Sequence, residues 1–189
     1  MKHKAELTIE CDLNAAPSTF LLRWNPAISS YTMERLDNDI EFYANQFSPY
    51  NEEWAEEDDF DWSVYEWKKA QKGDRFFMVR VGEGKTGIFA AGYFTSDPYK
   101  SDDWSGKGRE VYYMRMCFEA IFHPERTDII TIEELQRELP DINWEKGHSG
   151  ELLTPNDAAR LEQIWEEHLE KHMDDFKPRA VLNKSYYID

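Results

Sequence analysis

The stretch Arg75–Thr95 reads RFFMVRVGEGKTGIFAAGYFT, and it decides the fold of this chain. Two runs rich in aromatic and branched residues, Arg75–Val81 and Gly87–Thr95, flank a short glycine-rich segment. Such runs are typical of β-strands, and glycine-rich connections between them are typical of tight turns. We therefore predict a β-hairpin at the centre of a sheet or barrel.

Two further segments of the sequence predict strands around this hairpin. Glu110–Phe122 (EVYYMRMCFEAIF) has the same aromatic and branched composition. Thr19–Trp24 (TFLLRW) is a short apolar run that ends at Asn25-Pro26. Because the residue before a proline is pushed out of the helical region, this run is expected to be a strand followed by a turn.

Three segments predict helices. From Tyr31 onward, apolar residues recur at helical spacing at Met33, Leu36, Ile40, Tyr43 and Phe47. Thr131 and Glu134 match a capping box that starts a short helix through Leu139. Thr154-Pro155 places a cap and a first-turn proline before a last helix with Leu161 and Trp165 on one face. The predicted fold class is α+β.

Length and composition favour a single globular domain. The chain has 189 residues, of which 41% are hydrophobic and 15% aromatic. Residues 1–175 are the expected domain and 176–189 a tail, which either adds an edge strand or stays loose. No stretch approaches the roughly 20 apolar residues that a membrane span needs, so we expect a cytoplasmic protein without a membrane partner. Cys11 and Cys117 fit neither a disulfide framework nor a metal-binding spacing.

The distribution of charge is uneven. The net charge is -16, whereas proteins that follow a nucleic-acid backbone are normally basic. Residues 62–126 carry 11 basic and 9 acidic side chains, net +2, so the rest of the chain carries -18. Seven carboxylates lie in Asn51–Asp61, which we expect to be a solvated loop or short helix. Residues 62–126 are therefore the part of the chain where a polyanion such as a nucleic acid could bind.

Two patterns resemble catalytic or metal-binding motifs. Gly82–Gly87 fits GxGxxG, but a phosphate loop needs a helix after it, and here strand-like residues lie on both sides. His168 and His172 are four residues apart, as zinc ligands on a helix can be, but Leu169 replaces the glutamate of the metalloprotease motif. We expect a hairpin turn and a solvent-facing histidine pair. No catalytic residue, metal ligand or cofactor is predicted.

Four separated segments carry a resemblance to a known family. They are Arg23-Trp24-Asn25-Pro26; Asp61-Trp62-Ser63 followed by Lys72–Arg80; Gly87–Tyr93 with Ser96–Tyr99 and Trp104; and Asn143-Trp144 followed by His148-Ser149-Gly150. In this order they resemble EVE domains, members of the PUA-like superfamily that also includes YTH, ASCH and SRA modules. The similarity runs from about Thr19 to His168, and no nuclease domain accompanies it.

The resemblance implies a PUA-like mixed β-barrel (pseudobarrel) flanked by helices. At one end of such a barrel, a base flipped out of its stack is held between aromatic faces and recognised along its polar edge. By motif, Trp62 would be one wall of this aromatic cage, Ser63 a backbone or hydroxyl contact, and Trp104 a second wall. Trp24-Asn25 and Ser149-Gly150 would line its rim or floor. Core packing is the alternative for Trp24, because it lies beside an apolar segment.

Three functions remain open from the sequence. The first is a non-catalytic module that binds a modified nucleobase, in a nucleic acid or as a free nucleoside or nucleotide, and passes the signal to a separate effector protein. The second is an acidic interaction domain that engages a basic partner, for example by mimicking DNA. The third, an enzyme with an acidic residue at the barrel mouth, has the least support because no acid and base pair can be located by spacing.

Overall fold

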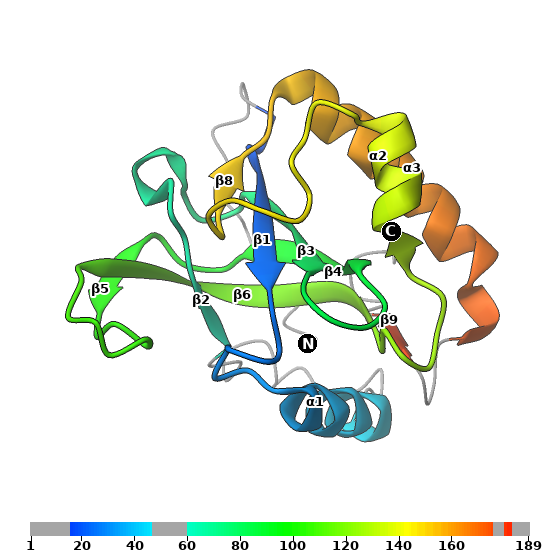
Figure 1. The fold of residues 1–189 in the computed structure, drawn as a ribbon, viewed down its shortest axis with the longest axis horizontal. Coiled ribbons are helices and arrows are strands. Elements are labelled where there is room, and N and C mark those ends of the chain that lie inside the picture. Colours follow the sequence, from blue (N-terminus) through cyan, green and yellow to red (C-terminus); the bar gives the residue numbers. More distant parts are fainter. Residues whose placement is uncertain (1–15, 47–59, 176–179, 183–189) are drawn as a thin grey trace, which may run out of the picture.

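A computed structural model describes residues 16–46, 60–175 and 180–182 of the chain. A curled mixed sheet lies at the centre of these residues, with α1 along one side and α2 and α3 beyond one end (Figure 1). The α-helices are α1 (Met33–Gln46), α2 (Ile132–Glu138) and α3 (Pro155–Lys171), and two short 3-10 helices are η2 (Trp67–Lys69) and η3 (Met173–Asp175). The α+β class expected from the sequence is confirmed.

Four long strands form the middle of the sheet, and five short ones extend it. The long strands are β1 (Thr19–Trp24), β3 (Arg75–Arg80), β4 (Gly87–Phe94) and β6 (Val111–Phe122). The short ones are β2 (Asp61–Ser63), β5 (Tyr99–Ser101), β7 (Ile130–Thr131), β8 (Glu151–Leu152) and β9 (Ala180–Leu182). The main order is β2-β6-β4-β3-β1-β8, while β5 and β9 pair with β6 and β7 pairs with β4.

The predicted hairpin is present. β3 and β4 pair in antiparallel fashion from Arg75 opposite Tyr93 to Arg80 opposite Gly87, so the GxGxxG string is a hairpin connection. β4 also approaches β6 very closely, because a Cβ atom at Gly92 would lie 2.0 Å from the carbonyl oxygen of Cys117. The register of the two strands shifts between Ala91 and Gly92. Glycine is therefore required at this bulge.

The helix caps form as predicted. The Thr131 hydroxyl accepts a hydrogen bond from the Glu134 amide at 3.3 Å, and the Glu134 carboxylate accepts one from the Thr131 amide at 2.8 Å. Thr154 accepts a hydrogen bond from the Asp157 amide at 3.2 Å at the start of α3. These local bonds satisfy amides that a helix N-terminus otherwise leaves unpaired.

A buried ionic cluster fixes α3 on the sheet. The guanidinium of Arg75 on β3 contacts Glu119 on β6 at 2.6 Å and Glu162 on α3 at 2.8 Å. Trp165 on α3 also donates its indole hydrogen bond to Glu119, at 2.9 Å. Burial alone would lower the pKa of Arg75, but the two carboxylates raise it above its ordinary value. The guanidinium therefore stays charged and ties two strands to one helix.

The histidine pair on α3 corrects one expectation. The His168 ring packs on Phe122 of β6 with centroids 4.9 Å apart, and it is half-buried. The whole of His172 is only 8% exposed. The prediction of a solvent-facing pair is therefore wrong, because the two rings lie on the side of α3 that meets the sheet. No helix in the described part of the chain is long and apolar enough to cross a membrane.

Candidate functional site

Trp62 lies on the short strand β2, where it pairs with Met114 of β6. Its ring is half-buried, stacks on Phe60 with centroids 6.0 Å apart and meets the edge of Tyr31 at 6.2 Å. The indole Nε1 donates a hydrogen bond to the Ser149 hydroxyl oxygen at 2.8 Å. The ring is thus held by packing and by one polar contact, while part of its surface reaches solvent.

The Ser149 hydroxyl connects three segments of the chain. Its oxygen accepts the Trp62 indole N–H and also the backbone N–H of Arg23 at 2.9 Å. A serine hydroxyl has two acceptor lone pairs and one proton, so both lone pairs are in use. Its proton has no acceptor within residues 16–46, 60–175 and 180–182. Among the described residues, this proton at the edge of the indole ring is therefore not committed to a protein acceptor.

Arg23 holds the loop that carries Ser149. Its side chain is 6% exposed and donates to the carbonyl oxygens of His148 and Asn143, each at 2.5 Å. It also contacts the Glu151 carboxylate at 2.7 Å. These contacts are 120 to 128 residues apart in sequence, so no local pattern could have predicted them. Arg23 belongs to one of the segments that resemble EVE domains, but only the structure shows that it holds the loop.

Gly150 joins this loop to the residues that follow β2. It is buried with a φ of 90°, and a Cβ atom there would lie 2.6 Å from the Cα atom of Val64. Its amide donates to the carbonyl oxygen of Leu21 at 2.9 Å, and its carbonyl accepts from the Glu66 amide at 3.0 Å. Only glycine suits this crossing point, since both the conformation and the close approach exclude a side chain.

Ser63 and Trp104 are associated with the face of β2 and β6 that is opposite to Trp62. Successive side chains on a strand alternate between faces, so Ser63 and its partner Tyr113 lie opposite to Trp62 and Met114. The Tyr113 hydroxyl accepts a hydrogen bond from the backbone amide of Trp104 at 3.1 Å. The Trp104 side chain is 47% exposed. The rings of Trp62 and Trp104 make no contact with each other in the described structure.

The loop that carries Trp104 has its own hydrogen-bond network. Asp103 accepts hydrogen bonds from the Arg109 side chain at 3.1 Å and from the Ser105 hydroxyl at 2.6 Å. These bonds, Arg109 first, hold the pKa of Asp103 well below its usual range. The carboxylate is therefore committed to organising the loop rather than to acid–base chemistry.

Tyr99 lies on the same face as Tyr113, and the two rings stack with centroids 6.4 Å apart. Its hydroxyl donates a hydrogen bond to the carboxylate of Asp61 at 2.5 Å. Burial, followed by this hydrogen bond, raises the pKa of Tyr99 to about 12. The phenol therefore keeps its proton at neutral pH.

Trp24 and Asn25 have local roles. Trp24 has no exposed surface, its ring packs on Phe89 with centroids 4.9 Å apart, and its Nε1 donates to the Tyr31 carbonyl at 2.6 Å. The structure therefore places Trp24 in the core and not at a rim, because the apolar strand β1 is buried along its whole length. Asn25 is partly exposed and accepts the Ala27 amide at 3.1 Å, which closes the turn after β1.

A stacked pair of rings lies beside Ser149. Tyr65, which is 57% exposed, stacks on the exposed His148 with centroids 3.8 Å apart and planes 9° from parallel. A second pair, Trp67 and Tyr112, stacks at 3.6 Å. Tyr65 lies only two positions after Ser63, and no sequence pattern indicated its stack on His148.

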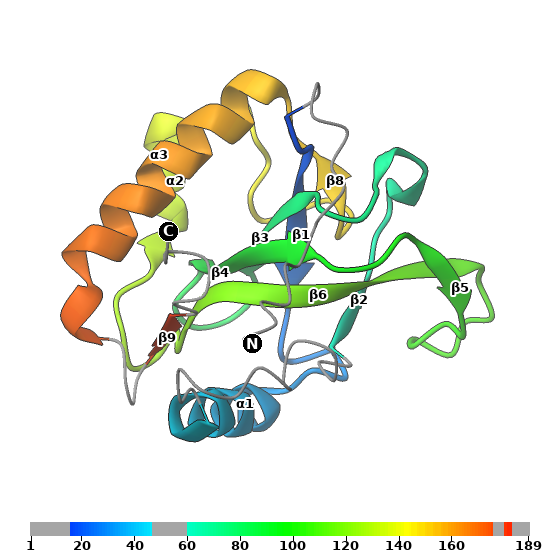
Figure 2. The ribbon, with the colours of Figure 1, turned by 180° about the vertical axis from the view of Figure 1, so that it is seen from behind.

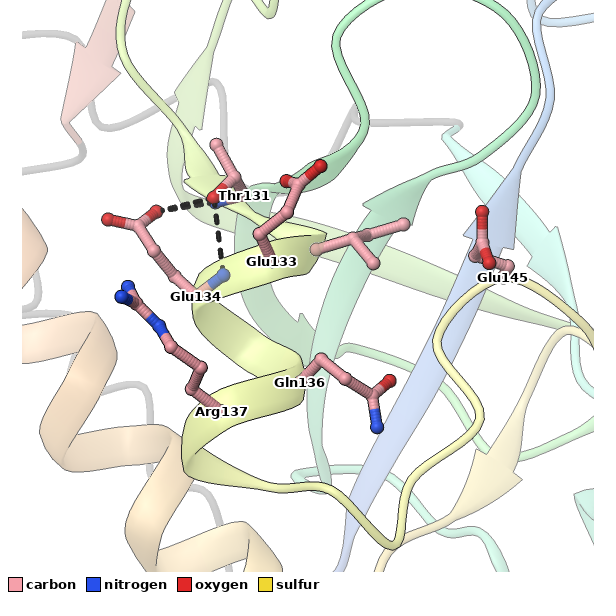
Figure 3. A pocket seen from close by; sticks show the side chains of 7 residues that line it. Thr131, Glu133, Glu134, Gln136, Arg137 and Glu145 are labelled. Carbon is pink, nitrogen blue, oxygen red and sulfur yellow. Dashed lines mark hydrogen bonds between the residues drawn. The ribbon is translucent and has the colours of Figure 1, made fainter.

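An open hollow of about 680 Å³ lies at α2, away from these residues (Figure 3). Thr131, Glu133, Glu134, Gln136, Arg137 and Glu145 line it, together with Ile132. The Thr131 and Glu134 side chains point toward each other and are hydrogen-bonded in the capping box. No predicted site residue lines this hollow. Within the described ranges, no group of three or more His, Cys, Asp or Glu side chains is placed to hold a metal ion.

Comparisons with known proteins show the fold only. No family model matches the chain, and no curated protein sequence matches it. A hypothetical protein from Leishmania major has a similar structure, with a TM-score of 0.50 and 12% identity over 81% of this chain and 97% of that one.

Two other solved structures have lower scores. The YTH domain of Mmi1 in complex with RNA has a TM-score of 0.47 and 10% identity, covering 84% of this chain and 87% of that one. A protein from Pseudomonas syringae has a TM-score of 0.47 and 12% identity, covering 77% of this chain and 98% of that one.

Proposed function

We propose that this chain is a non-catalytic binding module that holds a nucleobase against Trp62. One observation carries the proposal: the half-buried indole is fixed by the Ser149 hydroxyl, which keeps an unused proton at the edge of the ring. A flat ligand stacked on this indole would find a hydrogen-bond donor beside it. This arrangement agrees with the EVE-type, PUA-like resemblance of the motif that contains Trp62 and Ser63.

The energetics favour a planar ligand with a polar edge. Stacking of a base on one aromatic ring contributes about 1–3 kcal/mol. The Ser149 proton would select bases that present an acceptor at that edge, because a site built around a polar contact rejects analogues that lack it. Asn25 would border the site, whereas Ser63 and Trp104, which are associated with the opposite face of β2 and β6, would lie outside it. The edge of the base that faces the Ser149 hydroxyl would determine which base modifications the site accepts.

The test is to titrate the protein with methylated and unmodified adenosine, cytidine and guanosine by isothermal calorimetry. At least one nucleoside should bind, and Trp62→Ala should weaken it by at least about tenfold through loss of a stacking partner. Trp62→Phe keeps a ring and should retain most of the affinity, and thermal unfolding checks that each variant is folded. The proposal is wrong if no nucleoside binds the unmutated protein, or if Trp62→Ala binds equally well.

A second candidate function is engagement of a basic protein partner. Helices α2 and α3 together carry eight acidic and three basic side chains. Glu166, Glu167 and Glu170 are exposed on α3. A basic surface would be attracted to these helices, and salt would weaken that attraction.

A further inference from the structure

We infer that the base bound at Trp62 belongs to a single strand of nucleic acid, whose neighbouring base stacks on the Tyr65–His148 pair. This inference rests on the proposed function and extends it from a single base to two adjacent bases. It assigns a ligand-binding role to two residues outside the Trp62–Ser149 contact.

The pair is placed directly beside that contact. The Tyr65 amide donates to the Ser149 carbonyl oxygen at 2.9 Å, and His148 is the residue that precedes Ser149. The His148 carbonyl in turn accepts a hydrogen bond from the buried Arg23 guanidinium. The same backbone therefore fixes the rings of the pair and the hydroxyl beside Trp62.

The stack presents an aromatic surface that is already ordered. With its planes 9° from parallel, each ring covers one face of the other and leaves an outer face for a further ring. Tyr65 is one of only four large hydrophobic residues that are exposed in the described part of the chain. Because the two rings immobilise each other, a base that stacks on them loses less free energy to side-chain ordering than it would on a lone tyrosine.

The local charge suits a phosphate backbone. Residues 63–72 carry three lysines and one glutamate, in a chain whose net charge is -16. Lys69 pairs with Glu66 at 2.6 Å, whereas Lys68 is exposed and lies 5.5 Å from the Trp67 ring centroid. Exposed lysines beside stacked aromatic rings are the usual combination in surfaces that bind single strands.

The arrangement of the elements brings these parts of the chain together. In Figures 1 and 2, the segment that contains η2 lies beside β8 and the loop before it, and β2 leads directly into this region. Trp62 and Tyr65 both contact the segment His148-Ser149, through the Trp62–Ser149 hydrogen bond and the Tyr65–His148 stack. A strand bound at Trp62 would therefore need to cover only a short distance to reach the stack.

The experiment compares a nucleoside with the trinucleotide that contains the same base at its centre, using the best nucleoside from the panel. We expect the trinucleotide to bind about tenfold more tightly, as one added stacking contact predicts. Tyr65→Ala should abolish this advantage and change the dissociation constant of the nucleoside by less than about twofold. Met173→Ala, which removes another exposed apolar side chain on η3, is the matched control and should change neither.

The outcomes separate this inference from the proposed function. If the nucleoside binds in a Trp62-dependent way but the trinucleotide gains nothing, the inference is overturned and the proposed function stands. If no nucleoside binds, fluorescently labelled dT6 and rA6 strands test the stack directly by anisotropy. Strand binding that Tyr65→Ala weakens would support the binding role of the Tyr65–His148 pair even though the proposed function had failed, and the absence of strand binding would overturn that role.

Discussion

At the scale of single residues, Ser149 links the parts of the candidate site. Its one oxygen accepts hydrogen bonds from the backbone of β1 and from the indole on β2, two strands that do not pair with each other. Loss of this oxygen would leave two donors without a partner in a partly buried place. Unsatisfied buried donors are more costly than the net value of the hydrogen bonds they lose.

Ser149→Ala should therefore lower the free energy of unfolding by about 1–3 kcal/mol and weaken nucleoside binding. Ser63→Ala is a matched control, because Ser63 is equally half-buried but its hydroxyl makes no hydrogen bond with the described residues. It should change stability by less than about 0.5 kcal/mol. Urea unfolding followed by circular dichroism measures both variants. Equal effects of the two substitutions would show that Ser149 is not a structural link.

At the scale of elements, the predictable features are those with local causes. The β3–β4 hairpin follows from its glycine-rich turn, and α2 and α3 begin at caps whose partners are three residues away. The parallel pairing of β1 with β3 joins residues such as Thr19 and Arg75, and no sequence pattern indicated it. Strands as short as β2 and β8 carry too few residues to show a periodicity.

In the candidate site, too, some residues could be identified from sequence motifs, while others depend on contacts between distant parts of the chain. Trp62 and Ser149 were identified because their motifs resemble those of a family, and the structure places them in contact across 87 positions of sequence. The resemblance implied that Trp24 lines the rim or floor, but its strand is wholly buried, and the alternative of core packing holds for this residue. The Arg23 contacts and the Tyr65–His148 stack depend on tertiary packing alone, so neither could have been predicted.

The packing of α3 on the sheet predicts a dependence of stability on pH. Burial, followed by the charge of the neighbouring His172, lowers the pKa of His168 to about 4, and its buried Nε2 has no hydrogen-bond partner among the described residues. In the unfolded chain a histidine has a pKa of about 6.5. The unfolded state therefore binds more protons between these values, and the free energy of unfolding must fall as pH decreases from 6.5 toward 4.

We expect His168 to account for a loss of about 2 kcal/mol between pH 7 and pH 5. His168→Phe keeps a ring against Phe122 and removes the titrating group, so it should reduce the pH dependence by that amount. Met173→Ala changes an exposed residue that does not titrate and should leave the pH dependence nearly unchanged. Urea unfolding at the two pH values measures all three proteins. A His168→Phe variant that loses stability as steeply as the unmutated protein would contradict the assignment.

At the scale of the whole molecule, the acidic surplus of α2 and α3 is separated from the candidate site, although the seven carboxylates of Asn51–Asp61 adjoin Trp62 in the sequence. Figures 1 and 2 place α2 and α3 at the opposite end of the sheet from β5, with β2 on the β5 side. The acidic surplus of these helices therefore lies far from Trp62. Exposed charges act over about 8 Å at physiological ionic strength, so the helices need not repel a strand bound at β2. The acids of α2 and α3 therefore do not by themselves prevent an acidic protein from binding a nucleic acid at β2.

Neutralising the exposed acids of α3 tests this separation and the second candidate function together. In Glu166→Gln/Glu167→Gln/Glu170→Gln, trinucleotide affinity at 150 mM salt should stay within about twofold, because screening isolates the site from α3. A decalysine peptide, if it binds the unmutated protein, should bind this variant more weakly, while Trp62→Ala should leave peptide binding unchanged. Calorimetry with each ligand at 20 and 150 mM salt makes the comparison. If the triple variant bound the trinucleotide tenfold more tightly than the unmutated protein at 150 mM salt, the acidic helices would act on the site. The distance between α3 and β2 would then not explain how an acidic chain binds a strand.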